Sequence, residues 1–285
     1  MAREDVVSGP KWVVGGFVFF WVLNKVLRIF PAGMSTTGPQ AWKWKNTGVS
    51  LTHSLITGPW SLYCFYEYPK LAEDLINTYT SSSHMLISFS VGYFIHDLVD
   101  MARCHRKRSS YELMVHHVCV ILCFGLAVCS AMFVGYAVVA LFVEVNSIFL
   151  HTRQLLIIRG TNKAEPKYRL NSMLNIATFV IFRITVLGWM TRWIVMHKDH
   201  LSLPVYTLGS IGLAIIMLMN IVLFFRICNV DFTNKKHKEL NKGLAQAKYL
   251  EDNENVGTGG SVLSKTSPTS SILPALPPAA NLHLN

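Results

Sequence analysis

Ionisable side chains gather in stretches of the sequence that are otherwise apolar. One such stretch contains His96, Asp97 and Asp100, and the next opens with the adjacent pair His116 and His117. Residues three or four positions apart lie on one face of a helix, so Asp100 shares a face with both His96 and Asp97. Imidazoles and carboxylates held together in this way can act as general bases or nucleophiles. The pattern therefore indicates a reactive or binding site within apolar surroundings.

Three more apolar stretches carry polar groups. Glu144 and Asn146 follow the histidine pair, His53 precedes it, and Arg183 lies farther along the chain. A charged group at membrane depth is costly and usually faces the protein interior or a watery cavity. Acids and imidazoles on neighbouring helices would form a reactive set, in which a carboxylate orients one ring while the two rings serve as base and nucleophile. The candidate catalytic residues are His116, His117, Asp97 and Glu144.

Other interpretations of these residues stay open. Polar groups can simply pair between helices and fix their packing, which is the favoured interpretation for His53, Asn175 and Asn220 taken singly. Histidine and carboxylate ligands suit iron or zinc. The chain has only one adjacent histidine pair and no repeated histidine boxes, so we predict no metal and no cofactor. A channel or transporter would also line its path with polar groups, but the sequence shows no internal repeat of the kind that many transporters have.

The apolar stretches that must position these residues are long enough to cross a membrane. The chain has 285 residues, of which 51% are hydrophobic and 15% charged, and its mean hydropathy is +0.35. A membrane-spanning helix needs roughly 20 mostly apolar residues. The sequence therefore predicts an all-α, polytopic membrane helical bundle of about seven spans. These spans are expected near residues 11–29, 47–66, 84–102, 112–130, 132–157, 173–197 and 203–228.

Positive charge accumulates on one side of the predicted membrane. The formal net charge is +10, but the basic residues form short clusters beside the apolar stretches, without the basic stripe and interleaved aromatics of a nucleic-acid-binding surface. We therefore expect no nucleic-acid partner. Positive loops tend to stay cytosolic, so the N-terminus is predicted to lie outside and the C-terminus in the cytosol. The basic residues assigned to the cytosolic side are Arg28, Lys43, Lys45, Arg103, Arg106, Lys107, Arg108, Arg159, Lys163, Lys167, Arg169, Lys235, Lys236 and Lys238.

Four stretches of the sequence are similar to the TLC-domain family, whose membrane fold is shared with ceramide synthases. They are Trp44–Ser54, Gly92–Met101, Tyr111–His117 and Gly135–His151. Together they extend the resemblance over roughly residues 40–230, and within the family the sequence most resembles the calfacilitin subgroup. The resemblance implies a bundle in which six spans enclose a lipid-accessible cavity, with one further span at the N-terminus.

The resemblance also implies a role in membrane lipid composition. Proteins of this subgroup are associated with the plasma membrane and limit the incorporation of polyunsaturated chains into phospholipids, which keeps the membrane more rigid. We therefore expect a multi-pass regulator of plasma-membrane phospholipid acyl composition and fluidity, with the endoplasmic reticulum as the alternative location. The expected partners are membrane phospholipids or fatty acyl chains, with acyl-CoA and a membrane-protein partner as further candidates. The expected polar lining of the lipid cavity is His53, His96, Asp100, Asn146 and Arg183.

Two alternative functions accompany this expectation. In ceramide synthases the adjacent histidines, matched here by His116 and His117, are tied to acyl transfer, so a membrane acyltransferase acting on a lipid is the first alternative. The second is a non-catalytic modulator of a channel or of a lipid enzyme. Ceramide synthases carry a His-Asp-x-x-Asp motif one span after the histidines, whereas Phe142–Ser147 reads Phe-Val-Glu-Val-Asn-Ser here. Ceramide synthase activity is therefore not expected, because a shared fold does not supply a missing site.

Three domains are expected along the chain. Residues 1–39 form an N-terminal span or a signal sequence, and residues 40–234 form the TLC domain. Residues 235–285 form a cytosolic tail that is mostly disordered, because its composition is rich in Gly, Ser, Thr, Pro and Asn toward the end and buries too little apolar surface to offset the cost of ordering it.

Overall fold

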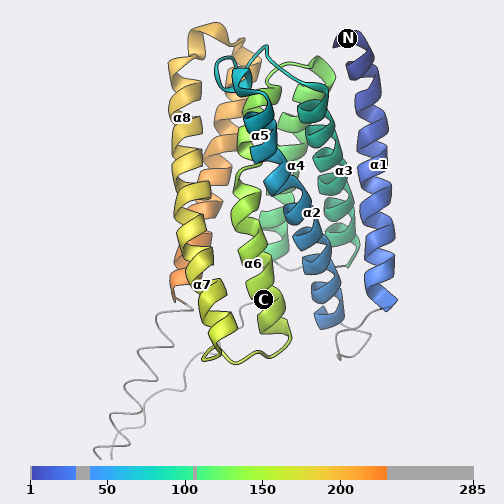
Figure 1. Ribbon diagram of the computed structural model, residues 1–285, viewed down its shortest axis with the longest axis vertical. Helices are drawn as coiled ribbons and strands as arrows, with labels where there is room; N and C mark the ends of the chain where they lie inside the picture. The colour runs from blue at the N-terminus through green and yellow to red at the C-terminus, as the bar shows by residue number, and fades with distance from the viewer. Residues whose placement is uncertain (1, 30–38, 105–107, 230–285) are drawn as a thin grey trace, which may run out of the picture. The chain divides into compact units, whose positions relative to one another are not determined.

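The structure, a computed structural model, describes residues 2–29, 39–104 and 108–229 (Figure 1). Within these ranges almost every residue is helical and none lies in a β-strand, which confirms the all-α prediction. The described residues up to Phe224 belong to one compact unit, and the contacts described below all lie in it. The expected disordered tail, residues 235–285, lies outside the described residues, as do the expected cytosolic residues Arg106 and Lys107.

The helices follow one another with short connections (Figure 1). The elements are α1 (Ala2–Ile29), α2 (Pro39–Glu67), η1 (Pro69–Ala72), α3 (Ser81–Cys104), α4 (Arg108–Ser130), α5 (Val134–Ala140), α6 (Val143–Ile158), α7 (Pro166–Phe179), the π-helical turn η2 (Val180–Thr185), α8 (Val186–Met196), η3 (Lys198–His200) and a final helix, Leu203–Asn229. The predicted span at 132–157 is confirmed as a helix that breaks at Leu141 and Phe142, between α5 and α6. The span predicted at 173–197 begins earlier, at Pro166.

Six of these helical segments are long and apolar enough to cross a membrane. They are Ser8–Ile29, Ser81–Cys104, Ser110–Ser130, Val134–Ile158, Pro166–Met196 and Leu203–Asn229. The predicted second span falls on α2, which has 29 residues but is more polar than these six. Its buried face carries polar side chains, those of Thr47, Ser50, His53, Ser54, Thr57 and Ser61. A helix that buries its polar face against other helices keeps its apolar face for the lipid, so low mean hydropathy does not argue against a seventh span.

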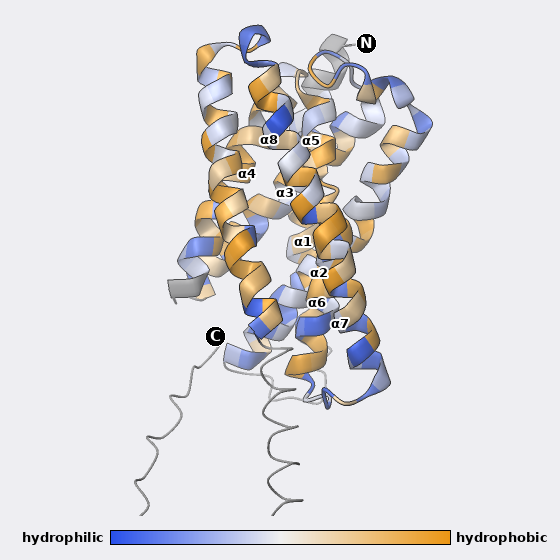
Figure 2. Cartoon of the chain, turned by 90° about the vertical axis from the view of Figure 1, so that its left-hand side faces the viewer, coloured by the Kyte–Doolittle hydropathy of each residue, from blue (hydrophilic) through white to orange (hydrophobic). Residues whose placement is uncertain are grey.

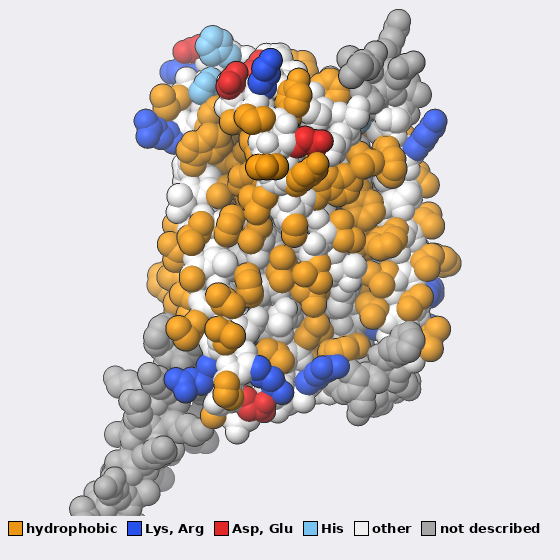
Figure 3. Space-filling view, in the orientation of Figure 1, with side chains coloured by type: hydrophobic (Ala, Val, Ile, Leu, Met, Phe, Trp, Pro, Cys, Tyr) orange, Lys and Arg blue, Asp and Glu red, His pale blue; other side chains and the backbone are white. Residues whose placement is uncertain are grey.

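Charged and apolar side chains separate along the helices. Figure 2 shows hydrophobic residues over the middle of the helices and hydrophilic residues toward the ends, and Figure 3 shows the same division on one face of the surface. Apolar side chains such as Val14, Ile181 and Leu218 are more than half exposed. In water such an exposed apolar surface would be unfavourable, so this division is the one expected of a helical bundle surrounded by lipid.

Helix α1 packs tightly against α3 through two glycines. A methyl group added at Gly92 would lie 2.3 Å from the carbonyl oxygen of Val13 and 2.6 Å from the amide nitrogen of Phe17. One added at Gly16 would lie 2.5 Å from the carbonyl oxygen of Phe89. Small residues allow membrane helices to approach this closely. The first predicted span is therefore a packed part of the helical unit in this structure.

Candidate functional site

Asp97 joins three helices in the interior. This α3 residue is 2% exposed, and one of its carboxylate oxygens accepts a hydrogen bond from the side-chain amide of Asn46 on α2. The other oxygen lies 3.5 Å from Nε2 of His117, which is on α4 and is 4% exposed. The predicted reactive set thus places Asp97 beside His117, and the pair ties α2, α3 and α4 together.

Glu144 occupies a second polar position, at the break between α5 and α6. It lies in the first turn of α6, where the helix dipole favours a carboxylate. Its Oε2 accepts a 2.6 Å hydrogen bond from Ser54 Oγ and lies 3.8 Å from Nδ1 of His53. These α2 residues reach Glu144 because Gly58 allows a close approach: a methyl group there would lie 3.1 Å from the amide nitrogen of Val145. The helices α2 and α6 therefore hold Glu144 and His53 together.

The ring of His53 is enclosed by aromatic side chains. It stacks on Tyr93 with a centroid distance of 3.8 Å and an interplanar angle of 12°, while Phe20 and Phe94 approach edge-on at 5.8 and 5.4 Å. His53 is 1% exposed, and within the described part of the chain neither ring nitrogen has a hydrogen-bond partner. Glu144 is thus the polar group that it faces.

The remaining members of the first predicted cluster point in different directions. His96 is buried and meets the edge of Phe17 on α1, at a centroid distance of 5.8 Å. Asp100 accepts a 2.8 Å hydrogen bond from Nε1 of Trp42 on α2. Neighbouring helix positions are rotated by about 100°, so His96 and Asp97 diverge although they are adjacent. The structure brings together Asp97 with His117 and Glu144 with His53, but it leaves His96 and Asp100 apart from both pairs.

Arg183 lies within the π-helical turn η2 and links it by hydrogen bonds to α6 and to the final helix. Its guanidinium donates to Oδ1 of Asn146 at 2.6 Å, to Oγ of Ser147 at 2.7 Å and to Oδ1 of Asn220 at 2.8 Å. Asn146 in turn donates to the backbone carbonyl of Asn175 on α7 at 2.9 Å. Single-turn π bulges often occur at functional sites. Here the bulge directs a cation toward polar partners on α6 and on the final helix.

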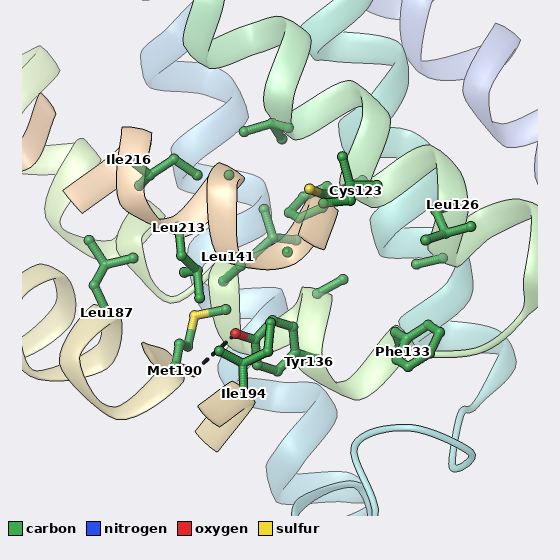
Figure 4. Close-up of a pocket in the computed structure, with 18 of the residues that line it drawn as sticks. Cys123, Leu126, Phe133, Tyr136, Leu141, Leu187, Met190, Ile194, Leu213 and Ile216 are labelled. Carbon is green, nitrogen blue, oxygen red and sulfur yellow. Dashed lines mark hydrogen bonds between the residues drawn. The ribbon is translucent and has the colours of Figure 1, made fainter. Parts of the chain in front are cut away.

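A cavity of about 130 Å³ lies beside these polar groups, between α4, α5, α6, α8 and the final helix (Figure 4). It has room for roughly ten water-sized groups, the size of an alkyl-chain segment. Its wall is almost wholly apolar, with Phe124, Leu141, Leu187 and Leu213 among the lining side chains. The hydroxyl of Tyr136 is directed at the cavity wall, where it donates to the carbonyl oxygen of Met190 at 3.1 Å.

Two of the nine candidate site residues line this cavity, His116 and Glu144. The half-buried ring of His116 lies 5.5 Å from that of His117 and 6.5 Å from that of Phe94, measured between centroids. The adjacent histidines therefore face different surroundings, since His116 meets the cavity and His117 meets Asp97. The other seven candidates lie outside the cavity wall.

Sequence reasoning missed several residues that complete the site. Asn46 and Ser54 are neutral side chains in a polar stretch of α2, and nothing in their type marks them as partners of Asp97 and Glu144. Tyr93 was missed as the stacking partner of His53. The stretch Gly92–Met101, which carried the family resemblance, was the available signal for Tyr93. Among the described residues, no group of three His, Cys, Asp or Glu side chains is placed to hold a metal ion.

Comparison with known proteins agrees with the fold. The TLC domain matches residues 43–229. The chain is 50% identical over 226 residues to TLC domain-containing protein 2 of Danio rerio, covering 79% of this chain and 91% of that protein. It is 33% identical over 232 residues to TLC domain-containing protein 1 of Mus musculus, covering 78% and 91% of the two chains, and 32% identical over 251 residues to TLC domain-containing protein 2 of Homo sapiens, covering 87% and 94%. The described residues contain six helices apolar enough to cross a membrane, and the chain is therefore a multi-pass membrane protein that belongs to the TLC-domain family.

Proposed function

We propose that the protein regulates the acyl composition of membrane phospholipids, and thereby membrane fluidity, by binding acyl chains within the bilayer. In this proposal it limits the incorporation of polyunsaturated chains. The observation that carries the proposal is the apolar cavity with His116 and Glu144 in its wall. An acyl group needs this combination, because its chain favours apolar walls while its carbonyl favours a polar group.

The length of the cavity supports an acyl chain as the ligand. Both His116 and Ala127, eleven residues later on α4, line the cavity. Eleven helical residues extend about 16 Å. This is about half of the ~30 Å hydrocarbon core, the depth that the acyl chains of one leaflet fill. A chain with its carbonyl at His116 would thus extend to the far end of the cavity near Leu126 and Phe133.

An acyltransferase is the second candidate, favoured by the different surroundings of the two histidines. His117 lies beside Asp97, whereas His116 faces the cavity that Glu144 also lines. In such a reaction His116 accepts the proton of a lipid hydroxyl, and the hydroxyl oxygen attacks the acyl carbonyl. The bond to the leaving thiol or alcohol breaks, and the proton passes to that group. The acyl donor would be acyl-CoA or a phospholipid.

The proposal is tested by phospholipid acyl profiles under a polyunsaturated fatty-acid load. Cells lacking the protein are rescued with the wild type, with His116→Ala, or with His84→Ala. His84 serves as a control histidine because it is buried, bonds to the carbonyl of Val128 at 3.0 Å and does not line the cavity. At equal protein levels, the wild type and His84→Ala are expected to lower polyunsaturated phospholipid, and His116→Ala is expected not to.

Other functions predict different acyl profiles in this experiment. If all three proteins lower polyunsaturated phospholipid, His116 has no chemical role, and a non-catalytic modulator of a channel or lipid enzyme is the better account. If the wild type itself leaves the profile unchanged, the lipid-composition proposal is wrong.

We also propose that the protein lies in the plasma membrane with its N-terminus outside and its C-terminus in the cytosol. Lys70 and Lys163 are exposed residues in different connections between helices. In a background with the native cysteines replaced by alanine, Lys70→Cys should react with an impermeant maleimide on intact cells, and Lys163→Cys only after permeabilisation. The reverse pattern would contradict this topology, and no labelling of either on intact cells would favour the endoplasmic reticulum.

A further inference from the structure

Two glycines of the final helix form part of the cavity wall. Gly209 and Gly212 both line the cavity. A methyl group added at Gly212 would meet one atom within 4 Å, Sγ of Cys123 at 3.4 Å, and one added at Gly209 would lie 2.7 Å from Cδ1 of Ile194. Cys123 and Ile194 also line the cavity (Figure 4). Any side chain at these two positions would therefore occupy the cavity or push a neighbour into it.

Five other glycines of the helices have different surroundings. Gly16 and Gly92 allow α1 and α3 to touch, and Gly58 allows α2 and α6 to touch. At Gly125 and Gly188 an added methyl group would meet nothing within 4 Å, and neither residue lines the cavity. A helical glycine costs up to about 1 kcal/mol relative to alanine, so its use calls for a reason. At Gly212 the use of glycine is explained by the space that it leaves inside the cavity.

The position of Gly212 along the cavity indicates which part of a bound acyl chain would lie beside it. Its neighbour Cys123 follows His116 by seven residues on α4, which is about 10.5 Å along the helix. An extended chain of single bonds advances about 1.2 Å per bond. A chain with its carbonyl at His116 would therefore pass Gly212 about nine bonds from that carbonyl. A cis double bond near this position displaces the chain sideways, whereas a saturated or trans chain stays straight.

We propose that Gly212, assisted by Gly209, makes the cavity selective for acyl chains that carry a cis bend about nine bonds from the carbonyl. The inference rests on the proposed function, because it needs an acyl chain bound with its carbonyl at His116. It adds the shape of the preferred chain and the residue that sets this preference.

The test uses the purified full-length protein and two fatty acids, oleate and elaidate. These share one chain length and one double-bond position and differ only in cis or trans geometry. The wild type is expected to bind oleate about tenfold more tightly, the lower end of what one methylene-sized group is worth in an apolar pocket. Gly212→Val should abolish this preference, because the added side chain weakens oleate binding more than it weakens elaidate binding. Gly188→Val is the control, since its side chain lies outside the cavity, and it should keep the wild-type preference.

A second variant, Cys123→Leu, fills the space beside Gly212 from α4 and keeps both glycines. Cys123→Leu should also remove the preference for oleate, so the inference stays testable if Gly212→Val does not fold. If the wild type binds both acids equally, or if both variants keep the preference, the inference is wrong while the proposed function stands. If the wild type binds neither acid, the proposed acyl site itself is wrong.

Discussion

Polar groups and empty space occupy different parts of the helical unit. Between α2, α3, α6 and η2, polar side chains reach across helices, as Asn46 does to Asp97, Ser54 to Glu144 and Arg183 to Ser147. Between α4, α5, α8 and the final helix the buried side chains are mostly apolar, and they enclose the cavity. His116 and Glu144 lie where the two regions meet.

This difference shows how a membrane protein can keep a cavity open. Lipid tails are as apolar as a leucine side chain, so burying apolar surface drives helix association weakly in a bilayer. Interhelical hydrogen bonds and glycine contacts in the polar region can instead hold the helices in place. The apolar region is then free to leave space unfilled, and the substitutions below should separate these two roles.

The largest effect is expected from Arg183→Leu in the polar region. It removes three interhelical hydrogen bonds, and at about 0.6–1.7 kcal/mol for each bond in a membrane the loss of stability should be about 3 kcal/mol. Arg192→Leu is the matched control, because Arg192 is exposed and its bond is to Sδ of Met196 on the same helix. Thermal unfolding of the purified proteins measures both. Equal stability of the two variants would mean that the polar region does not hold the unit together.

Gly92→Val should destabilise the unit by about 2 kcal/mol, within the range of overpacked cores. The added side chain would collide with the backbone of α1 at Val13 and Phe17, and backbone cannot move aside as a flexible side chain can. At Gly125 an added methyl group would meet nothing within 4 Å, so Gly125→Val should leave the thermal midpoint nearly unchanged. A Gly92→Val protein as stable as the wild type would show that α1 is not tightly packed on α3.

Replacing His117 by alanine should reduce stability more than replacing His116 does. His117→Ala leaves buried Asp97 without its imidazole partner, so a loss of about 1–3 kcal/mol is expected. His116→Ala enlarges the cavity and should cost less than about 1 kcal/mol, while abolishing the lipid effect. Thermal unfolding combined with acyl profiles distinguishes the two. If His116→Ala proved the more destabilising, the division of the pair between structure and chemistry would be reversed.

Tyr136→Phe should have the smallest effect, about 0.6 kcal/mol. It removes one hydrogen bond, to the carbonyl of Met190, and leaves the aromatic ring that lines the cavity. Acyl binding should be unchanged, because this hydroxyl is directed at the backbone of α8. A marked change in acyl affinity with little change in thermal stability would show that the hydroxyl serves the ligand instead.

The spans were predictable from composition because lipid imposes length and hydropathy on each crossing. The polar candidates were predictable because charges inside such spans are rare. Their partners were not, since helix rotation decides that Asp97 meets His117 while His96 meets Phe17. The break at Leu141–Phe142 and the π-helical turn at Arg183 depend on tertiary contacts, and the sequence does not mark either.

The cavity was the least predictable feature, because apolar side chains that face lipid and those that face a cavity are of the same types. Val118 and Val120 on α4 illustrate this. Val118 is 44% exposed on the surface, and Val120 is 6% exposed and lines the cavity. Only the assembled helices distinguish the two, so the resemblance to the TLC-domain family, and not the pattern of residues, gave the expectation of an internal lipid site.

The central claim, that an acyl chain lies in the cavity with its carbonyl at His116, is tested most directly by photocrosslinking. Two fatty acids carry a diazirine either near the carboxyl group or near the methyl end, and peptide mass spectrometry locates the labels on the wild-type protein. We expect the first acid to label the segment 116–120 and the second to label segments 126–136 and 201–208, with excess oleate competing against both. Labels confined to lipid-facing surfaces such as that of α1, insensitive to oleate, would contradict the claim.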